Sequence, residues 1–341
     1  MNKQRRDNDI IQLAHGGGGR LMHDLIQDVF ESAFRQEDFS ARHDAALLRD
    51  INGNVVMSTD SFVVNPLFFP GGDIGSLAVN GTVNDLAMQA ARPLYMSTGF
   101  IIEEGCPLAF VRRVARSMRI AADRAGIAIV TGDTKVVERG HGDGIYINTA
   151  GIGVIEHEDT LGPERIEPGD AIILSGDIGR HGIAVLATRE ELALESELES
   201  DCAPLAADVL ALVEQGIKLH CLRDLTRGGL GTALVELSED SQKTFVVEED
   251  AIPVSNAVAS ACEVLGFDPL YVANEGRFAA FLPADQASEA VAFLANRNPE
   301  LQPVIIGEVQ DDGKPIVVAR SPLGTERVID MLSGDQLPRI C

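Results

Sequence analysis

The chain has 341 residues, of which 45% are hydrophobic and 23% charged, a composition typical of a globular protein with room for two domains. Its formal net charge of -24 at pH 7 disfavours non-specific binding to nucleic acid or to an anionic membrane surface. A protein this acidic must bind any phosphate through backbone amides, metal ions and a few placed basic side chains.

The five cysteines show neither a CxxC spacing nor a zinc-finger pattern. The first residues do not resemble a signal peptide, and no apolar run reaches the length that spans a membrane. We therefore expect a cytoplasmic protein with reduced thiols and with no nucleic-acid or membrane partner.

Hydrophobic periodicity and the positions of glycine and proline predict alternating strands and helices in the first half of the chain. Residues 15–19 (HGGGG) precede an amphipathic helix and are either a flexible linker or a phosphate-covering lid, because consecutive glycines permit close approach to a ligand. They are not a Walker loop, since no Gly-Lys-Ser or Gly-Lys-Thr follows. The predicted elements after them are strand 54–64, helix 74–90, strand 95–102, a helix opened by Pro107 and closed by Gly126, strand 127–130 and strand 144–155.

A polar stretch at 156–169, which contains two prolines, is the predicted domain boundary. We expect residues 1–160 and 161–332 to form two αβ domains and residues 333–341 to form a tail. Alternating strands and helices indicate α/β or α+β layers. The second series comprises strand 171–174, a glycine loop at 175–182, helices, the motif RDLTRGG at 223–229, a helix to Glu239, strand 244–247, a helix to Leu265, the motif ANEG at 273–276 and strand 278–282.

Aspartates recur at strand ends or in glycine-flanked loops, at Asp44, Asp60, Asp85, Asp133 and Asp224. Each one alone is more often a helix cap or a turn residue. Together, in an acidic chain, they favour a Mg²⁺–nucleotide site, because Mg²⁺ binds through a few carboxylates and the substrate phosphates.

Two further residues are candidates for chemistry. Lys135 follows Gly132 and Asp133, where it contacts a phosphate, orients a carboxylate or is simply a surface lysine. Glu275 lies in a glycine-flanked turn between apolar segments. A partly desolvated carboxylate there is poised as a general base, and a turn-capping role is the alternative.

The last nine residues lack helical periodicity and contain Gly334 and Pro338, so we expect an extended, mobile tail. A tail of this length reaches roughly 30 Å when stretched, at about 3.3 Å per residue. Cys341 is therefore either incidental in a frayed terminus or a thiol that moves into a cleft and out again.

Over nearly the whole chain after the first ten residues, the sequence resembles the HypE family of hydrogenase maturation factors, the carbamoyl dehydratases of nickel–iron hydrogenase assembly. The motifs that carry the resemblance are HGGGG at 15–19, STDS at 58–61, PLFFPGG at 66–72, ND at 84–85, TGDTKVV at 131–137, RDLTRGG at 223–229, ANEG at 273–276 and PRIC at 338–341. PRIC is the specific one. The others also resemble the wider superfamily of aminoimidazole ribonucleotide synthetase, selenophosphate synthetase and thiamine monophosphate kinase.

The resemblance implies an α+β fold with an N-terminal, ATP-binding αβ domain that dimerises and a C-terminal αβ domain. It also implies that Cys341 is both carrier and substrate. A carbamoyltransferase, HypF, would place a carbamoyl group on the thiol, and ATP would phosphorylate the amide oxygen, which is otherwise a poor leaving group. Elimination of phosphate, with water excluded, would leave a thiocyanate. Its cyanide would pass to iron on the HypC–HypD complex.

We assign the site residues from the resemblance and from their positions. The expected catalytic residues are Cys341, Glu275 and Lys135. The expected ATP-binding residues are Gly17, Gly18, Asn84, Thr131, Gly132, Asp133 and Arg227. The expected Mg²⁺ ligands are Asp44, Asp60, Asp85 and Asp224.

Two other functions remain open. A small-molecule kinase or synthetase of the same superfamily would leave Cys341 incidental, although the chain lacks an obvious catalytic cysteine of the selenophosphate synthetase type near its N-terminus. A metal-binding or scaffold protein would use Cys341 and His15 as ligands. Two distant ligands do not make a site, because zinc takes three or four protein ligands.

Overall fold

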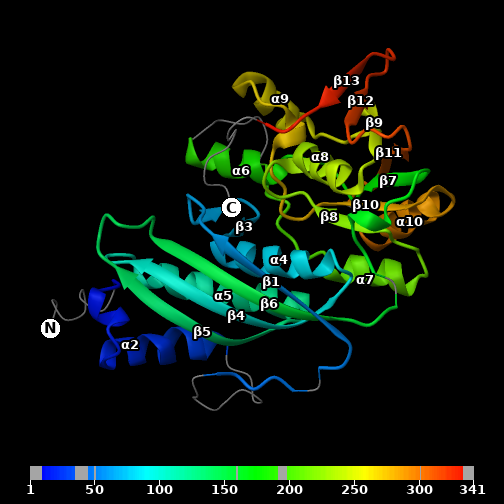
Figure 1. Cartoon of the computed structure of the whole chain (residues 1–341). Helices are drawn as coiled ribbons and strands as arrows, with labels where there is room; N and C mark the ends of the chain where they lie inside the picture. Colours follow the sequence, from blue (N-terminus) through cyan, green and yellow to red (C-terminus); the bar gives the residue numbers. More distant parts are fainter. Residues whose placement is uncertain are drawn as a thin grey trace.

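The computed structural model describes residues 10–34, 45–49, 51–158, 160–190, 198–299 and 301–332. Two large β-sheets, each with helices packed against it, divide the molecule into an N-terminal and a C-terminal half (Figure 1). The fold is α+β, as expected from the sequence.

The N-terminal half is built on a four-stranded sheet with the strand order β1-β6-β4-β5. Strand β6 pairs antiparallel with β1 and β4, whereas β4 and β5 are parallel. Helices α4 (Ile74–Ala87) and α5 (Leu108–Ala125) lie on one face, and no described element covers the other (Figure 1). The strands are β1 (Asn54–Phe62), β4 (Arg92–Glu103), β5 (Ala128–Val137) and β6 (Ile145–Ile155).

Local sequence signals explain both of these helices. The Asp73 carboxylate accepts hydrogen bonds from the amides of Gly75 and Ser76 and so caps the start of α4. Helix α5 ends at Gly126, whose left-handed φ of 69° suits glycine. The expected helices in these two regions are confirmed, as are the strands expected at 54–64, 95–102 and 144–155, apart from a few residues at their ends.

One expectation about β5 is wrong. The sequence predicted a strand over 127–130, but β5 continues to Val137 and includes the TGDTK motif. The motif is held in the sheet by parallel pairing with β4, where Gly132 lies opposite Thr98 and Lys135 opposite Ile101. This long-range pairing leaves no local signal in the sequence of the motif.

The glycine-rich N-terminal segment packs at the sheet edge beside β5. The sequence predicts an amphipathic helix after it, with Leu21, Leu25, Val29 and Phe30 on one apolar stripe. Leu25, Val29 and Phe30 are buried, whereas Leu21 is exposed, so the stripe is partly confirmed. The Phe30 ring lies 4.6 Å from the Phe100 ring of β4. The elements of this segment are η1 (Leu13–Gly16), α2 (Arg20–Leu25), the π-helical η2 (Ile26–Glu31) and α3 (Ser32–Phe34).

The C-terminal half contains a seven-stranded sheet with the order β13-β12-β9-β11-β7-β10-β8. Only the β12–β9 pair is parallel. Its strands are β7 (Asp170–Leu174), β8 (Cys221–Asp224), β9 (Thr244–Glu248), β10 (Phe278–Pro283), β11 (Val304–Gln310), β12 (Val317–Arg320) and β13 (Glu326–Ile329). Its helices are α6 (Arg180–Arg189), α7 (Ala206–Glu214), α8 (Gly229–Ser241), α9 (Asn256–Leu265) and α10 (Ala284–Arg297). The shorter elements of the chain are β2 (Phe68–Phe69), β3 (Gly72–Asp73), η4 (Pro163–Arg165), η5 (Glu249–Ala251) and η6 (Pro269–Tyr271).

The two halves share a hydrophobic core. Helix α4 contacts α7, and Leu77 and Leu86 of α4 belong to the same buried cluster as Val209 and Leu212 of α7. Apolar burial on both sides of α4 explains why this helix is apolar around most of its circumference. Because the boundary is a packed interface, the polar residues along it are held in defined positions.

Candidate active site

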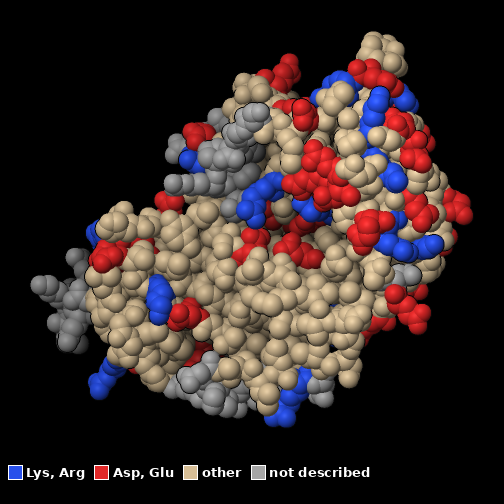
Figure 2. Space-filling view, in the orientation of Figure 1, with Lys and Arg blue, Asp and Glu red and all other residues tan. Residues whose placement is uncertain are grey.

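Acidic and basic side chains gather where the two halves meet (Figure 2). Asp60 comes from β1, Asp85 from α4, and Asp224 from the end of β8. The Ser58 hydroxyl donates a hydrogen bond of 2.5 Å to Asp85, and the Arg227 guanidinium lies 3.3 Å from Asp60. The structure therefore brings together three of the four predicted Mg²⁺ ligands and one predicted ATP-binding residue.

The carboxylates of this acidic cluster perturb one another. Burial raises the pKa of Asp224 to about 7, and the negative charges of Asp85 and Asp60 add to the rise. Burial also raises the pKa of Asp85, despite the opposing hydrogen bond from Ser58. The Oδ2 atom of Asp224 is buried without a hydrogen-bond partner in the described part of the chain. An added positive charge would relieve these costs, so the donor set fits a hard cation.

The acidic cluster is not a complete metal cage. Within the described ranges, no three His, Cys, Asp or Glu side chains are grouped closely enough to hold a metal ion. The fourth predicted ligand, Asp44, lies outside the described residues. The arrangement suits Mg²⁺, which keeps several waters and takes substrate phosphate oxygens in addition to one or two carboxylates.

Glu275 lies on the C-terminal side of the boundary and is only 2% exposed. Its Oε1 atom is buried and has no hydrogen-bond partner in the described structure. Burial, the charge of Asp201 and the charge of Asp224 raise its pKa well above the ordinary glutamate value. A carboxylate in this environment is a strong base once it is ionised.

The loop that carries Glu275 is held by Asn274. The Asn274 side chain donates to the carbonyl groups of Leu225 and Val272 and accepts from the amide of Gly179, at 3.0, 3.1 and 2.7 Å. This one amide therefore ties the Glu275 loop to the segment after β8 and to the start of α6. Asn274 therefore has a structural role in the ANEG motif, separate from the carboxylate of Glu275.

Asn84 joins the two halves. Its Nδ2 atom donates to the carbonyl groups of Ala203 and Glu275, at 3.1 and 3.3 Å, and its Oδ1 atom accepts from the Leu205 amide at 2.8 Å. The side chain is buried and its donor and acceptor atoms are used within the protein. In this structure Asn84 connects α4 to the Glu275 loop, while its predicted role in ATP binding stays a prediction.

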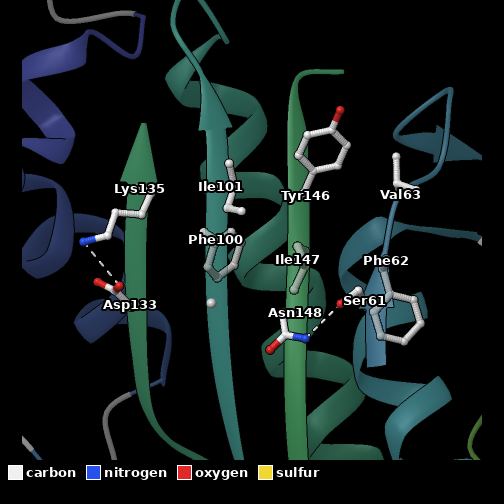
Figure 3. A pocket seen from close by; sticks show the side chains of 11 residues that line it. Ser61, Phe62, Val63, Phe100, Ile101, Asp133, Lys135, Tyr146, Ile147 and Asn148 are labelled. Atoms are coloured by element: carbon white, nitrogen blue, oxygen red, sulfur yellow. Dashed lines mark hydrogen bonds and ion pairs between the residues drawn. The ribbon is translucent and has the colours of Figure 1, made fainter. Parts of the chain in front are cut away.

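A cavity of about 360 Å³ lies on the uncovered face of the N-terminal sheet. Figure 3 shows Lys135 and Asp133 together on β5 at one side of it, with the Lys135 Nζ atom 3.4 Å from Asp133. On the opposite side, Asn148 donates to the Ser61 hydroxyl and to the Asp60 carbonyl, both at 2.9 Å. The cavity thus extends across the sheet to the residue next to Asp60. Asn148 was not singled out from the sequence, because a polar residue in mid-strand carries no local signal.

The other predicted ATP-binding residues lie along or beside β5. Thr131 and Gly132 are within the strand and do not line the cavity. Gly132 is required by packing, because a Cβ atom there would lie 2.3 Å from the Thr98 carbonyl oxygen of β4. Gly17 and Gly18 are exposed, and the adjoining Gly16 packs against Val136, next to Lys135. The glycine-rich segment therefore lies at the same sheet edge as Lys135.

The described cysteines are poor nucleophiles. Burial raises the pKa of Cys106 and Cys262 to about 11 and that of Cys202 and Cys221 to about 12. Such thiols hold very little thiolate at neutral pH. The predicted acceptor, Cys341, lies outside the described residues.

Comparison with known proteins defines the class first. The family models of the N-terminal and C-terminal domains of AIR synthase related proteins match residues 42–155 and 167–320. The chain is an AIR synthase related protein with both domains of that family.

Closer relatives define the particular family. The chain is 48% identical over 341 residues to the carbamoyl dehydratase HypE of Azotobacter vinelandii, with 100% of both chains covered. It matches a crystal structure of HypE in complex with ATP at a TM-score of 0.93 and 46% identity, over 96% of this chain and 99% of that chain. It also matches a structure of a HypE–HypF complex at a TM-score of 0.79 and 44% identity, over 90% of this chain and 99% of that chain. The chain belongs to the HypE family, and the expectation of a carbamoyl dehydratase is confirmed.

Proposed function

We propose that this chain uses ATP to dehydrate a carbamoyl group carried on the thiol of Cys341, and that the product supplies cyanide for the iron of a nickel–iron hydrogenase. Glu275 is the observation that supports this most directly. It is a buried carboxylate with an unpartnered oxygen and a raised pKa, and it lies beside the acidic cluster. A carboxylate of this kind suits removal of an amide proton.

The cavity on the N-terminal sheet is the proposed ATP site. Its volume lies within the range of small-molecule pockets, which is roughly 300–1,000 Å³. Lys135 supplies positive charge there, and Gly17 and Gly18 can approach phosphates without a side chain. We also propose that Asn84, Thr131, Gly132, Asp133 and Arg227 take part in ATP binding, as expected from the resemblance. The similar HypE structure in complex with ATP supports ATP as the ligand.

Mg²⁺ is the proposed metal. Asp60, Asp85 and Asp224 would hold it together with phosphate oxygens and waters, with Asp44 as a further candidate, because carboxylate oxygens are the hard ligands that it prefers. When bound, Mg²⁺ supplies positive charge that neutralises phosphate oxygens.

The chemistry balances in two steps. The amide oxygen of the S-carbamoyl group attacks the γ-phosphorus of ATP, so that an O–P bond forms, ADP leaves and one N–H proton is released. Glu275 then takes the second N–H proton while the C–O bond breaks and phosphate leaves, which produces S–C≡N. The sum is loss of one water from the carbamoyl group and hydrolysis of one ATP. Glu275 itself is buried, which suits a reaction that must exclude bulk water from the activated intermediate.

The proposed partners follow from the same reaction. HypF is the proposed carbamoyltransferase, which the similar HypE–HypF complex supports. The HypC–HypD complex is the proposed cyanide acceptor. The reaction needs a reduced thiol, so we place it in the cytoplasm. We also propose a homodimer, because the uncovered sheet face carries exposed apolar residues and few charges (Figure 2).

The test is mass spectrometry of the C-terminal peptide after incubation with HypF, its carbamoyl donor and ATP. The parent protein should gain a carbamoyl group and then lose one water. Cys341→Ala should form neither adduct while it keeps its nucleotide affinity. Glu275→Gln should accumulate the carbamoyl adduct and lose water roughly 10²- to 10⁴-fold more slowly, the usual contribution of a general base.

Cys202→Ala is the matched control, because Cys202 is the described thiol whose pKa Glu275 influences. This variant should behave like the parent. Dehydrated product in Cys341→Ala, or its loss in Cys202→Ala, would contradict the assignment of the carrier thiol. Water loss at the parent's rate in Glu275→Gln would remove Glu275 from the mechanism.

A further inference from the structure

Asp201 is a buried carboxylate outside the acidic cluster, and it faces the Glu275 loop. Its side chain is fully buried. The two carboxylate oxygens accept hydrogen bonds from the Glu275 amide at 3.2 and 3.3 Å, and Oδ2 also accepts from the Gly276 amide at 3.1 Å. Two successive backbone amides thus converge on one side chain, which fixes the peptide units on both sides of Glu275.

The charge of Asp201 is balanced by Arg277. The Arg277 guanidinium lies 3.8 Å from Asp201 and also donates to Asp177 and to the Gly276 carbonyl, at 2.8 and 2.9 Å. A buried carboxylate with an opposite charge and two backbone donors is a stable arrangement. Loss of the Asp201 charge would still leave Arg277 paired with Asp177.

The backbone contact between these segments is unusually close. A Cβ atom on Gly276 would lie 2.0 Å from the Asp201 carbonyl oxygen. Only glycine allows the loop to approach Asp201 in this way. The close packing of the Glu275 loop against Asp201 therefore requires the glycine of the ANEG motif.

The carbonyl group of Glu275 is held as well as its amide. It accepts hydrogen bonds from the Ala203 amide and from the Asn84 side chain, both at 3.3 Å. Ala203 lies two residues after Asp201, so one short segment holds both backbone polar groups of Glu275. The Oε1 atom of the Glu275 side chain has no hydrogen-bond partner in the described structure. The hydrogen bonds to the backbone of Glu275 therefore help to set the direction of its side chain.

We propose that Asp201 is a positioning residue for the dehydration step: it holds the backbone amides of Glu275 and Gly276 so that the Glu275 carboxylate faces the domain boundary. This inference rests on the proposed role of Glu275 as the base. A displacement of about 1 Å in a reacting group can cost roughly 10²-fold in rate.

The first measurement compares Asp201→Asn with the parent. This change keeps the shape of the side chain but replaces one of the two acceptor oxygens with a donor, which cannot accept from the Glu275 or Gly276 amide. We expect dehydration to slow by roughly 10- to 100-fold, with carbamoylation and the Kd for ATP unchanged. Asp208→Asn is the matched control, because Asp208 on α7 pairs with Arg297 and not with the Glu275 loop. It should dehydrate at the parent's rate.

The second measurement separates positioning from general stability. In a Glu275→Gln background there is no base to position, so Asp201→Asn should cause no further loss of rate. A loss of the same size in both backgrounds would overturn the proposal, as would a parent-like rate in Asp201→Asn alone. If Asp201→Asn does not fold, the same cycle is run with Asp201→Glu, where a non-additive loss supports the proposal and an additive loss overturns it. Water loss in the parent is scored separately, so failure here is distinguishable from failure of the proposed function.

Discussion

At the scale of single residues, two buried carboxyl groups are costly to ionise because they lie away from water. Asp224 and Glu275 both have a raised pKa, and in both cases burial is the largest cause. Neither residue has an opposite charge in direct contact among the described ion pairs. Such costs are typical of sites that bind cations or move protons, because ligand binding relieves them.

The raised pKa of Asp224 predicts how the stability of the protein depends on pH. The pKa of Asp224 is about 7 in the folded state and roughly 3.9 in an unfolded chain, so the folded state holds the proton more tightly. The parent should therefore lose stability as the pH rises from about 4 to about 7. Asp224→Asn removes this penalty, and its advantage over the parent should grow across that window to the order of a few kcal/mol.

Urea denaturation at several pH values, in buffer with a chelator, measures the difference between the two proteins. A difference that stays constant from pH 5 to pH 8 would show that Asp224 does not titrate as inferred. Added Mg²⁺ should stabilise the parent more than Asp224→Asn.

At the scale of elements, β5 carries a glycine that packing requires and two of the proposed site residues. Asp133 and Lys135 are among the residues that line the cavity, and Figure 3 shows their side chains directed toward each other. Between them and the start of the strand, Gly132 lies against the Thr98 carbonyl of β4 with no room for a side chain. The positions of Asp133 and Lys135 therefore depend on how closely β5 pairs with β4.

We predict that Gly132→Ala weakens ATP binding as well as stability. The added methyl group must push β5 away from β4, at a typical overpacking cost of about 1–3 kcal/mol, and this displaces Asp133 and Lys135. Gly126→Ala is the control, because Gly126 has a left-handed φ but no atom within 4 Å of an added Cβ. The control should lose stability and keep its ATP affinity. Calorimetric titration with ATP that finds equal affinity in both variants would contradict this account of β5.

At the scale of the whole molecule, the N-terminal sheet is covered on one face only. Val55, Met57 and Ile101 are 55%, 67% and 43% exposed on the other face. The corresponding surface in Figure 2 carries few charged side chains, in contrast to the densely charged C-terminal half. A broad apolar face of this kind is typical of a protein–protein interface. No helix in the described ranges has the length and apolarity needed to cross a membrane.

We predict that Met57→Lys favours the monomer. A buried charge at the centre of a dimer interface should raise the dimer dissociation constant at least about 30-fold, the equivalent of losing a 2 kcal/mol contact. Val264→Lys is the control, since Val264 is 85% exposed on α9 in the other half of the molecule. Light scattering coupled to size exclusion, at several protein concentrations, gives the result. A monomeric parent at micromolar concentration would contradict the proposed homodimer.

The sequence by itself determined the features that depend on near neighbours in the chain. Three such features can be identified without a structure. They are the start of α5 at Pro107 and its end at Gly126, the alternation of strands and helices, and the motifs that place the chain in the HypE family. Hydrophobic periodicity and helix caps depend on a few neighbouring residues, so they can be recognised in a short stretch of sequence. The candidates Asp60, Asp85, Asp224 and Glu275 were visible for the same reason, because each lies in a short motif.

Only the tertiary structure decided which of these residues meet, and what holds them. Asp201 and Asn148 have no motif that marks them, and Asn84 uses its amide between the two halves. The extension of β5 through TGDTK depends on a partner strand about 30 residues earlier. Hydrogen bonds between distant segments depend on chain topology, which cannot be read from the local sequence. The same is true of the burial that raises the pKa values of Asp224 and Glu275.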